Sequence, residues 1–216
     1  MRIVELWRYP VKSMSGEPLQ SAEIREDGIA GDRVVQVRNA RGRVVTSRSH
    51  PLLLGHRVTL GPDGEPRVDG RPWNAPEVAR DVEAAAGAGS RLLRFDGPER
   101  FDVLPLLVAT DGAIQAFGHD RRRLRPNIVI GGVEGLAERE WEGMWLRARR
   151  ILIRIQDLRQ RCIMTTFHPD TLEQDVEVLQ GIHRRFGGSL ALNCSIVRGG
   201  RLSVGDPVEL LERDPA

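Results

Sequence analysis

Short runs of apolar and β-branched residues dominate the chain and predict β-strands. The clearest runs lie at residues 3–7, 32–37, 43–46, 56–60, 104–109, 127–130, 145–155, 190–197 and 207–210. The polar segment 39–42 separates two of these runs and predicts a hairpin. The stretch 61–74 is rich in Gly, Pro and Asp, which predicts either a long loop or a boundary between two subdomains.

Three segments carry helical signals. Residues 76–86 begin with a proline, which suits a first helical turn, and residues 111–117 predict a short helix. The clearest helix begins with Asp170 as its N-cap and ends at Gly187. Its apolar positions recur at helical spacing and are Leu172, Val176, Leu179, Ile182 and Phe186. Because strands far outnumber helices, we predict a mainly-β fold with a few helices (α+β), built as a β-barrel domain and a second barrel-like subdomain.

The overall composition indicates a globular intracellular protein. The 216 residues are 40% hydrophobic and 29% charged, which is enough to bury a core. No apolar run approaches the length of a membrane span, and the N-terminus lacks the apolar core of a signal peptide. Two cysteines cannot form a disulfide framework, so the predicted location is cytoplasmic and we expect no membrane partner.

The charge pattern argues against nucleic acid as a partner. The net charge is +2, and Lys12 is the single lysine among 32 basic residues. Codon bias in a GC-rich genome explains the excess of arginine, although arginine also suits phosphate and carboxylate binding. The basic run 121–125 is either a solvated turn or an anion site. A near-neutral balance disfavours a dedicated nucleic-acid binder, which stays the third and weakest functional hypothesis.

Cys162 lies in the most informative segment, after a predicted strand and before the clearest helix. Arg159 and Arg161 flank it and would stabilise a thiolate, which is both a nucleophile and a metal ligand. The alternative is an inert, buried cysteine. Cys194 stands in an apolar strand and is interpreted as core packing; a disulfide with Cys162 is disfavoured in the cytosol. No set of four cysteines can hold an iron–sulfur cluster, so we expect none in this chain.

Several motifs, in order along the chain, carry a resemblance to a known family. They are Y-P-V-K-S at 9–13, G-D-R at 31–33, V-T-S-R at 45–48, L-R-P-N-I-V-I at 124–130, R-C-I-M-T-T-F-H-P-D-T at 161–171, G-G-S-L-A-L-N-C-S-I-V at 187–197 and G-D-P-V-E-L at 205–210. The chain therefore resembles the MOSC family, named after the C-terminal domain of molybdenum cofactor sulfurases. It is similar to the amidoxime-reducing component proteins, in which an N-terminal β-barrel domain precedes the MOSC domain. The domains are expected at residues 1–85 and 86–212.

The resemblance implies a molybdenum cofactor (molybdopterin), with Cys162 as the metal ligand and catalytic residue. The matching cofactor-binding positions are Lys12, Ser13, Arg33, Ser47, Arg48, Thr110, Arg125 and Asn127. Lysine and arginine suit a phosphate, and asparagine can both donate to and accept from a pterin edge. His168 stands where the family often has an acid, so its substrate preference does not transfer.

Two functions follow from the resemblance. The first is an oxidoreductase that reduces small N-oxygenated (N-hydroxylated) compounds with electrons from a separate donor protein. The alternative is a sulfur or cofactor carrier, in which Cys162 holds a persulfide or the molybdenum cofactor without reductase activity. Metal and persulfide analysis would distinguish the two, since the enzyme requires molybdenum and a carrier of sulfur alone does not.

Overall fold

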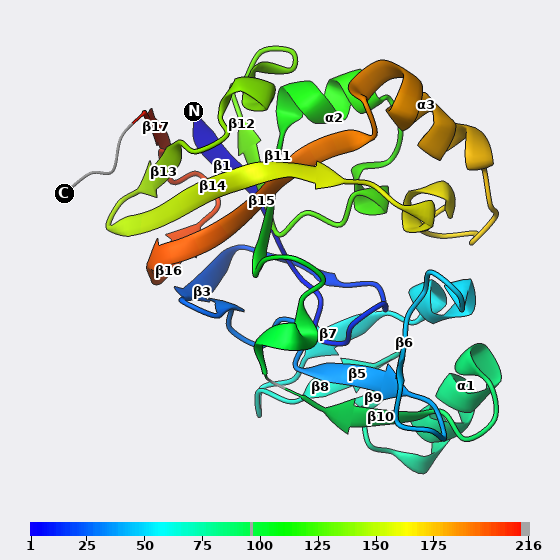
Figure 1. The fold of residues 1–216 in the computed structure, drawn as a ribbon. Helices are drawn as coiled ribbons and strands as arrows, with labels where there is room; N and C mark the ends of the chain where they lie inside the picture. Colours follow the sequence, from blue (N-terminus) through cyan, green and yellow to red (C-terminus); the bar gives the residue numbers. More distant parts are fainter. Residues whose placement is uncertain (96, 213–216) are drawn as a thin grey trace.

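The structure is a computed structural model that describes residues 1–95 and 97–212. It has two lobes, which lie one above the other in Figure 1. The upper lobe contains a large sheet with helices α2 and α3, and the lower lobe contains small sheets with helix α1. The predicted class, mainly β with a few helices, is confirmed.

The eight-stranded sheet of the upper lobe has the order β17-β13-β14-β15-β11-β12-β1-β2. Its strands are β1 (Arg2–Arg8), β2 (Glu17–Leu19), β11 (Leu106–Thr110), β12 (Ile128–Gly131), β13 (Trp145–Ala148), β14 (Ile151–Gln160), β15 (Ser189–Arg198) and β17 (Glu209–Leu211). Neighbours are antiparallel except β11 and β12, which run parallel. The strand ladders among the described residues do not close into a barrel. An isolated bridge between Arg2 and Pro207 brings the segment before β17 beside β1, and the backbone N–H of Ile3 donates to the carbonyl of Asp206 there at 2.9 Å.

The described residues also form three smaller sheets. In the lower lobe, one consists of β10 (Arg91–Arg94), β5 (Val35–Arg38) and β6 (Val44–Val45), and another of β7 (Val58–Leu60), β8 (Pro66–Val68) and β9 (Arg71–Pro72). A third consists of β16 (Gly200–Ser203), β3 (Ser21–Arg25) and β4 (Gly28–Ile29). This sheet pairs an early segment of the chain with a late one, and it lies where the lobes meet in Figure 1.

Helices cover the ends and faces of these sheets. The α-helices are α1 (Pro76–Ala86), α2 (Asp111–Phe117) and α3 (Val176–Phe186). Five 3-10 turns are η1 (Pro51–Gly55), η2 (Pro98–Arg100), η3 (Arg121–Arg123), η4 (Ala137–Glu140) and η5 (Ile163–Thr166). The ranges predicted for α1 and α2 are confirmed. None of the helices in the described ranges is both long and apolar enough to cross a membrane.

The start predicted for the third helix is wrong. α3 begins at Val176, and its N-cap is Asp175, whose side chain accepts from the N–H of Glu177. The backbone N–H of Asp170 instead donates to Nδ1 of His168 at 3.2 Å, and this hydrogen bond closes a turn. Leu172 has a φ of 61° and is outside the helix. The hydrogen bond to His168 therefore holds this segment in a turn, and the helix starts later than Asp170.

Two other predictions from the strand pattern also need correction. Residues 145–155 form two antiparallel strands, β13 and β14, because the chain turns back at Arg149, which has a φ of 54°. The stretch 61–74 is not a long loop, since it contains β8 and β9. The predicted hairpin at 39–42 is confirmed by the pairing of β5 with β6.

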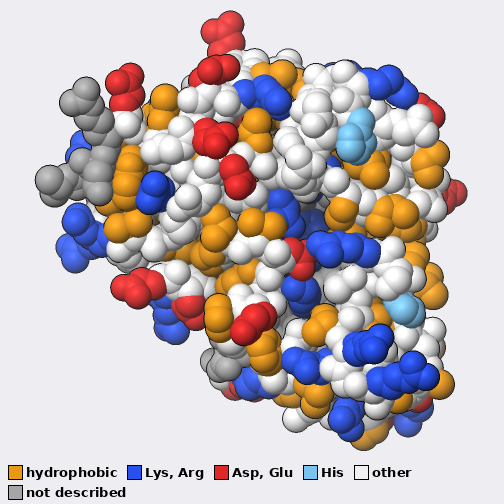
Figure 2. Space-filling model, viewed as in Figure 1, with side chains coloured by type: hydrophobic (Ala, Val, Ile, Leu, Met, Phe, Trp, Pro, Cys, Tyr) orange, Lys and Arg blue, Asp and Glu red, His pale blue; other side chains and the backbone are white. Residues whose placement is uncertain are grey.

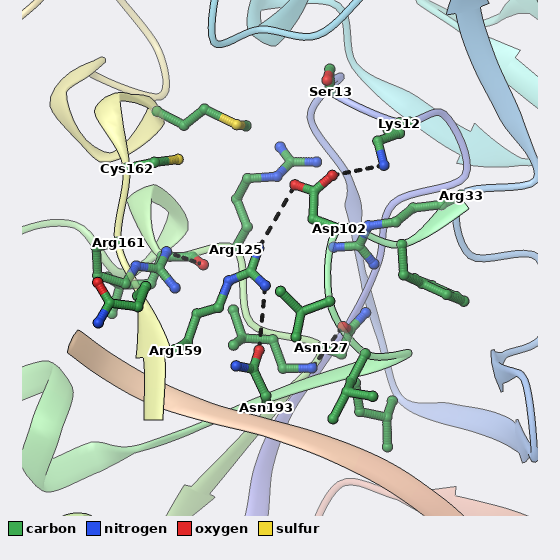
Figure 3. Close-up of a pocket in the computed structure, with 18 of the residues that line it drawn as sticks. Lys12, Ser13, Arg33, Asp102, Arg125, Asn127, Arg159, Arg161, Cys162 and Asn193 are labelled. Atoms are coloured by element: carbon green, nitrogen blue, oxygen red, sulfur yellow. Dashed lines mark hydrogen bonds and ion pairs between the residues drawn. The ribbon is translucent and has the colours of Figure 1, made fainter. Parts of the chain in front are cut away.

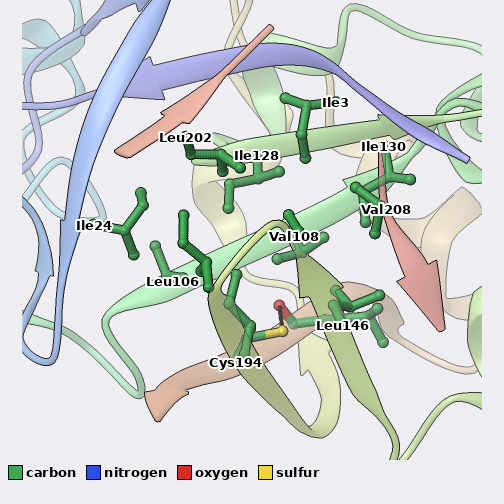
Figure 4. Close-up of a cluster of buried hydrophobic side chains, with 14 of the residues drawn as sticks. Ile3, Ile24, Leu106, Val108, Ile128, Ile130, Leu146, Cys194, Leu202 and Val208 are labelled. Carbon is green, nitrogen blue, oxygen red and sulfur yellow. Dashed lines mark hydrogen bonds between the residues drawn. The ribbon is translucent and has the colours of Figure 1, made fainter. Parts of the chain in front are cut away.

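The main apolar core lies against the large sheet. Figure 4 shows Ile3, Leu106, Ile128 and Leu146 converging there from four different strands. Cys194 lies in this cluster and is fully buried, so its interpretation as core packing is confirmed. Separate cores form in the lower lobe and beneath α2 and α3. The fold thus has an apolar core in each lobe and a polar region between them.

Candidate functional site

A cavity of about 90 Å³ lies between the lobes. In Figure 2, basic side chains gather in the hollow between the lobes, around an acidic side chain. Six of the residues predicted from the sequence line this cavity, although they come from segments far apart in the chain. They are Lys12, Ser13, Arg33, Arg125, Asn127 and Cys162 (Figure 3).

Cys162 is held at the cavity by the turn that follows β14. It caps η5, and its carbonyl oxygen accepts from the backbone N–H of Thr165 at 3.0 Å and from the Thr165 hydroxyl at 2.9 Å. The Thr166 hydroxyl donates to the carbonyl of Ile163 at 2.7 Å. The two threonines therefore satisfy the backbone of the turn and fix the position of the thiol. Cys162 is a free, half-buried cysteine that forms no disulfide with Cys194.

Arg161 and Arg159 flank the thiol and place positive charge at this end of the cavity. Nη2 of Arg161 donates to the carbonyl of Leu124 at 2.7 Å, whereas its Nε and Nη1 atoms are buried without a hydrogen-bond partner. Burial, and then the charge of Arg159, lowers the pKa of Arg161 to about 10. Arg159 donates to Oδ1 of Asn193 at 3.4 Å. Burial also lowers the pKa of Arg159, while a pKa near 10 keeps Arg161 charged at neutral pH.

Asp102 is the central carboxylate of the site. Its Oδ1 lies 2.8 Å from Nζ of Lys12, and its Oδ2 lies 2.6 Å from Arg48 and 3.7 Å from Arg159. Burial alone would raise the pKa of Asp102, but the hydrogen bond and charge of Lys12 and the charge of Arg48 hold it below its usual value. One carboxylate thus connects two cations of the lower lobe with one of the upper lobe.

Tyr9 supports two more arginines of the cavity. The guanidinium of Arg125 lies 4.2 Å from the centre of the Tyr9 ring, and that of Arg33 lies 5.1 Å from it. Arg33 also pairs with the fully buried carboxylate of Asp32. Burial lowers the pKa of Arg125 to about 10. Cation–π contacts with a single ring therefore hold both guanidinium groups in place.

Three of the predicted residues have a left-handed backbone. The φ angles are 72° at Ser13, 55° at Arg33 and 56° at Arg125. Non-glycine residues rarely adopt this conformation, which costs on the order of 1–3 kcal/mol each. Such strain persists where the surrounding structure requires a particular side-chain direction, and all three side chains face the same cavity.

The other predicted residues do not all face the cavity. Thr110 caps α2, since its hydroxyl accepts from the N–H of Ala113 at 3.2 Å. Ser47 is fully buried and its Oγ has no hydrogen-bond partner. Arg48 reaches the site through Asp102. Asn127 lines the cavity, but its amide already donates to Asp32 at 3.2 Å.

Sequence reasoning missed three polar residues of the site. Asp102 follows a segment without a regular pattern, and only its position before β11 could have indicated it. Asp32 stands in the G-D-R motif at 31–33, directly before Arg33. Asn193 precedes Cys194 in an apolar strand, where a lone amide is itself a signal of a polar partner.

The arginines of the basic run 121–125 differ in the kind of partner that they bind. Arg122 pairs with Asp120 and Asp170, both at 2.7 Å, and Arg123 donates to the carbonyls of Thr165 and Thr166.

Within the described residues, no group of three or more His, Cys, Asp or Glu side chains could hold a metal ion.

Comparison with known proteins gives matches along nearly the whole chain. Residues 1–93 match the model of the MOSC N-terminal beta barrel domain, and residues 112–209 match the model of the MOSC domain. The chain is 25% identical to human mitochondrial amidoxime-reducing component 1, over 97% of this chain and 82% of that protein. It is 23% identical to mitochondrial amidoxime reducing component 2 of Macaca fascicularis, over 95% of this chain and 82% of that protein.

The fold is also similar to that of a solved structure. The YUAD protein from Bacillus subtilis superposes with a TM-score of 0.52 at 14% sequence identity, over 99% of this chain and 96% of that chain. At this identity the likeness concerns the fold alone.

Proposed function

Because this chain belongs to the MOSC family, with the MOSC N-terminal domain preceding the MOSC domain, we propose that it binds a molybdenum cofactor and reduces N-oxygenated compounds. The relatives named amidoxime-reducing components support this reaction type. When bound, the cofactor supplies a metal that exchanges an oxygen atom and two electrons. A separate protein donates the electrons. The cytoplasmic location and the boundary near residue 85 stay predictions.

The observation that carries the proposal is the set of unpaired polar atoms beside Cys162. Nε and Nη1 of Arg161, the residue next to Cys162, are buried without a partner among the described residues. A buried donor without a partner costs about 1–3 kcal/mol, and more when it is charged. The backbone strain at Ser13 and Arg33 adds to this cost. A bound anionic ligand would offset both.

The residue types fit this cofactor. Cys162 offers a soft thiolate, the ligand type that thiophilic metals prefer. Lys12, Arg48 and Arg159 already hold one carboxylate, that of Asp102, and so can hold the oxygens of a phosphate. Arg161 lines the same cavity, and two of its guanidinium nitrogens have no partner among the described residues. We assign it the role of donating hydrogen bonds to oxygen atoms near the thiol.

The size of the cavity limits what it can enclose. At about 90 Å³ it is smaller than the cavities of 300–1,000 Å³ that surround whole organic ligands. We therefore assign it to the charged part of the cofactor, which Lys12, Arg159 and Cys162 would hold. This assignment requires the Asp102 side chain to adjust when the cofactor binds.

Reduction of benzamidoxime by the wild type and by Cys162→Ser tests the proposed function. The protein is made in a host that synthesises the cofactor, and reduced benzyl viologen replaces the unknown donor. We expect turnover by the wild type and a loss of at least about a hundredfold in Cys162→Ser. Cys194→Ala is the matched control and should keep its turnover. A wild type that carries a persulfide on Cys162 and no molybdenum would instead support the sulfur-carrier function.

A further inference from the structure

A second, larger cavity lies beside the first. Its volume is about 460 Å³, within the range of cavities that bind small organic molecules. Met164, Arg123 and Arg125 line both cavities and therefore form the wall between them. Met164 is only two residues from Cys162 in the same turn. Its flexible side chain can move without disturbing the backbone.

The lining of this second cavity is aromatic and apolar. Trp7 and Tyr9 of the β1 segment contribute rings, and Phe167 contributes a ring from the segment after η5. Leu54 and Pro169 add aliphatic surface. Both lobes thus supply walls, and a flat ring would bury its faces against them.

Most polar groups of this lining already have partners. The Tyr9 hydroxyl donates to the carbonyl of Pro126 at 3.1 Å, and the Ser15 hydroxyl donates to the carbonyl of His56 at 3.2 Å. Arg122 is paired with two aspartates, and Arg125 donates to the carbonyl of Met14 at 2.7 Å. A pterin, whose edges need several hydrogen bonds, would find few partners here.

Arg57 is the exception. It is exposed and lines the cavity, and its backbone N–H donates to Asp69 at 2.8 Å. Within the described residues its guanidinium makes no hydrogen bond or ion pair. Arginine binds carboxylate and phosphate groups through two parallel hydrogen bonds. The cavity therefore offers apolar walls and one free cation.

We propose that this second cavity binds the body of the substrate, a flat aromatic N-oxygenated compound with an anionic group that Arg57 recognises. The N–O group of the substrate would point across Met164 toward Cys162. This inference rests on the proposed function and adds the position of the substrate and its preferred charge.

Calorimetric titration with two probes tests the charge preference. The probes are 4-carboxybenzamidoxime, which is anionic, and benzamidoxime, which is neutral, and the molybdenum content of each sample is recorded. Arg57→Glu should weaken binding of the anionic probe by at least about tenfold, or about 1.4 kcal/mol. Binding of the neutral probe should change by less than about twofold. Arg41→Glu carries the same charge change on an exposed loop outside the cavity and should change neither affinity.

A second variant tests the location. Pro18 is exposed and lines the cavity, so Pro18→Trp narrows it without removing core contacts. We expect binding of both probes to fall, while Cys162 stays as reactive toward iodoacetamide as in the wild type. Unchanged binding in Pro18→Trp would overturn the location. Equal losses for both probes in Arg57→Glu would overturn the charge preference.

The outcomes also separate this inference from the proposed function. The wild type made in a host that synthesises the cofactor could bind the probes, in a manner that depends on Arg57 and Pro18, and yet contain no molybdenum. This outcome would support the cavity assignment and count against the reductase. Probes that bind only after the cofactor is removed would show that the cofactor occupies this cavity, which would overturn the inference. Turnover of benzamidoxime that neither variant affects would leave the reductase in place and also overturn the inference.

Discussion

Cys162 lies in the turn after β14, beside a polar cavity, whereas Cys194 lies in the middle of the neighbouring strand β15 and is fully buried. The strands pair directly, with Ile155 opposite Cys194. Around Cys194 the neighbours are apolar side chains of the main core. Around Cys162 they are the charged side chains of Arg159 and Arg161, and two nitrogens of Arg161 have no partner among the described residues.

The two regions differ in how completely their apolar surface is buried and their polar atoms are paired. The core needs nothing else, because its apolar surface is already buried. The cavity keeps charged groups close together, uses a strained backbone and leaves polar atoms without partners, which lowers stability. Natural proteins retain such costs where function requires them. The difference supports our proposal that Cys162, rather than Cys194, carries the function.

The largest expected difference is in thiol reactivity. In native protein at pH 8, iodoacetamide should modify Cys162 at least about a thousandfold faster than Cys194. Burial raises the pKa of the Cys194 thiol, and exposure of this thiol requires opening of the core. Mass spectrometry of peptides after timed labelling gives both rates. In denaturant the two rates should become similar, and similar rates in the native state would remove the contrast.

The next effect is on stability. Cys194→Ser should lower the free energy of unfolding by about 1–3 kcal/mol, because it buries a hydroxyl among apolar side chains. Cys162→Ser in cofactor-free protein should change it by less than about 0.5 kcal/mol, as is usual outside the core. Urea denaturation measures both. A Cys162→Ser variant as destabilised as Cys194→Ser would assign Cys162 to packing.

The site also predicts an alkaline titration. Burial raises the pKa of Tyr9 to about 12, although the charges of Arg125 and Arg33 oppose it. The folded protein therefore holds the phenol proton more tightly than the unfolded chain, and the free energy of unfolding should fall as pH rises from 10 toward 12. Tyr9 is the single tyrosine, so phenolate absorbance at 295 nm reports it directly.

Tyr9→Phe is the control for this titration, because it keeps the ring that both arginines contact. Its unfolding free energy should fall less steeply between pH 10 and 12 than that of the wild type. A phenolate that forms with a midpoint near 10 in folded protein would show that Tyr9 is exposed to solvent.

The smallest effect is expected at the rim of the site. Arg48 is 44% exposed in its ion pair with Asp102, so Arg48→Ala should change the free energy of unfolding by less than about 0.5 kcal/mol. Its loss should nevertheless lower cofactor retention after gel filtration. Arg71→Ala removes a comparable surface pair with Asp81 and should leave retention intact. Equal retention in both variants would remove Arg48 from the site.

Much of the fold was predictable from the sequence because strands and capped helices carry local signals. The ranges of α1 and α2 and the hairpin of β5 and β6 were predicted in this way. The turn at Arg149 and the late start of α3 were not predicted. An arginine with a positive φ, and a turn closed by a hydrogen bond to a histidine ring, have no strong local sequence pattern. Tertiary contacts decide such positions.

The candidate site was predictable only in part. The motifs identified Lys12, Arg33 and Cys162, which the structure brings to one cavity. Asp102 was missed because its importance arises from three cations that reach it from separate segments. Thr110 was selected from its motif position, but the structure uses its hydroxyl to cap α2. Roles that depend on long-range convergence need the folded chain.

Quantification of molybdenum and pterin tests the central claim most directly. Wild type, Cys162→Ser and Cys194→Ala are purified in parallel from one host that makes the cofactor. We predict about one molybdenum and one pterin per chain in the wild type and in Cys194→Ala. Cys162→Ser should lose most of its molybdenum, because the protein's thiolate ligand is gone. Equal molybdenum in all three proteins, or none in the wild type, would contradict the assignment of Cys162 as the metal ligand.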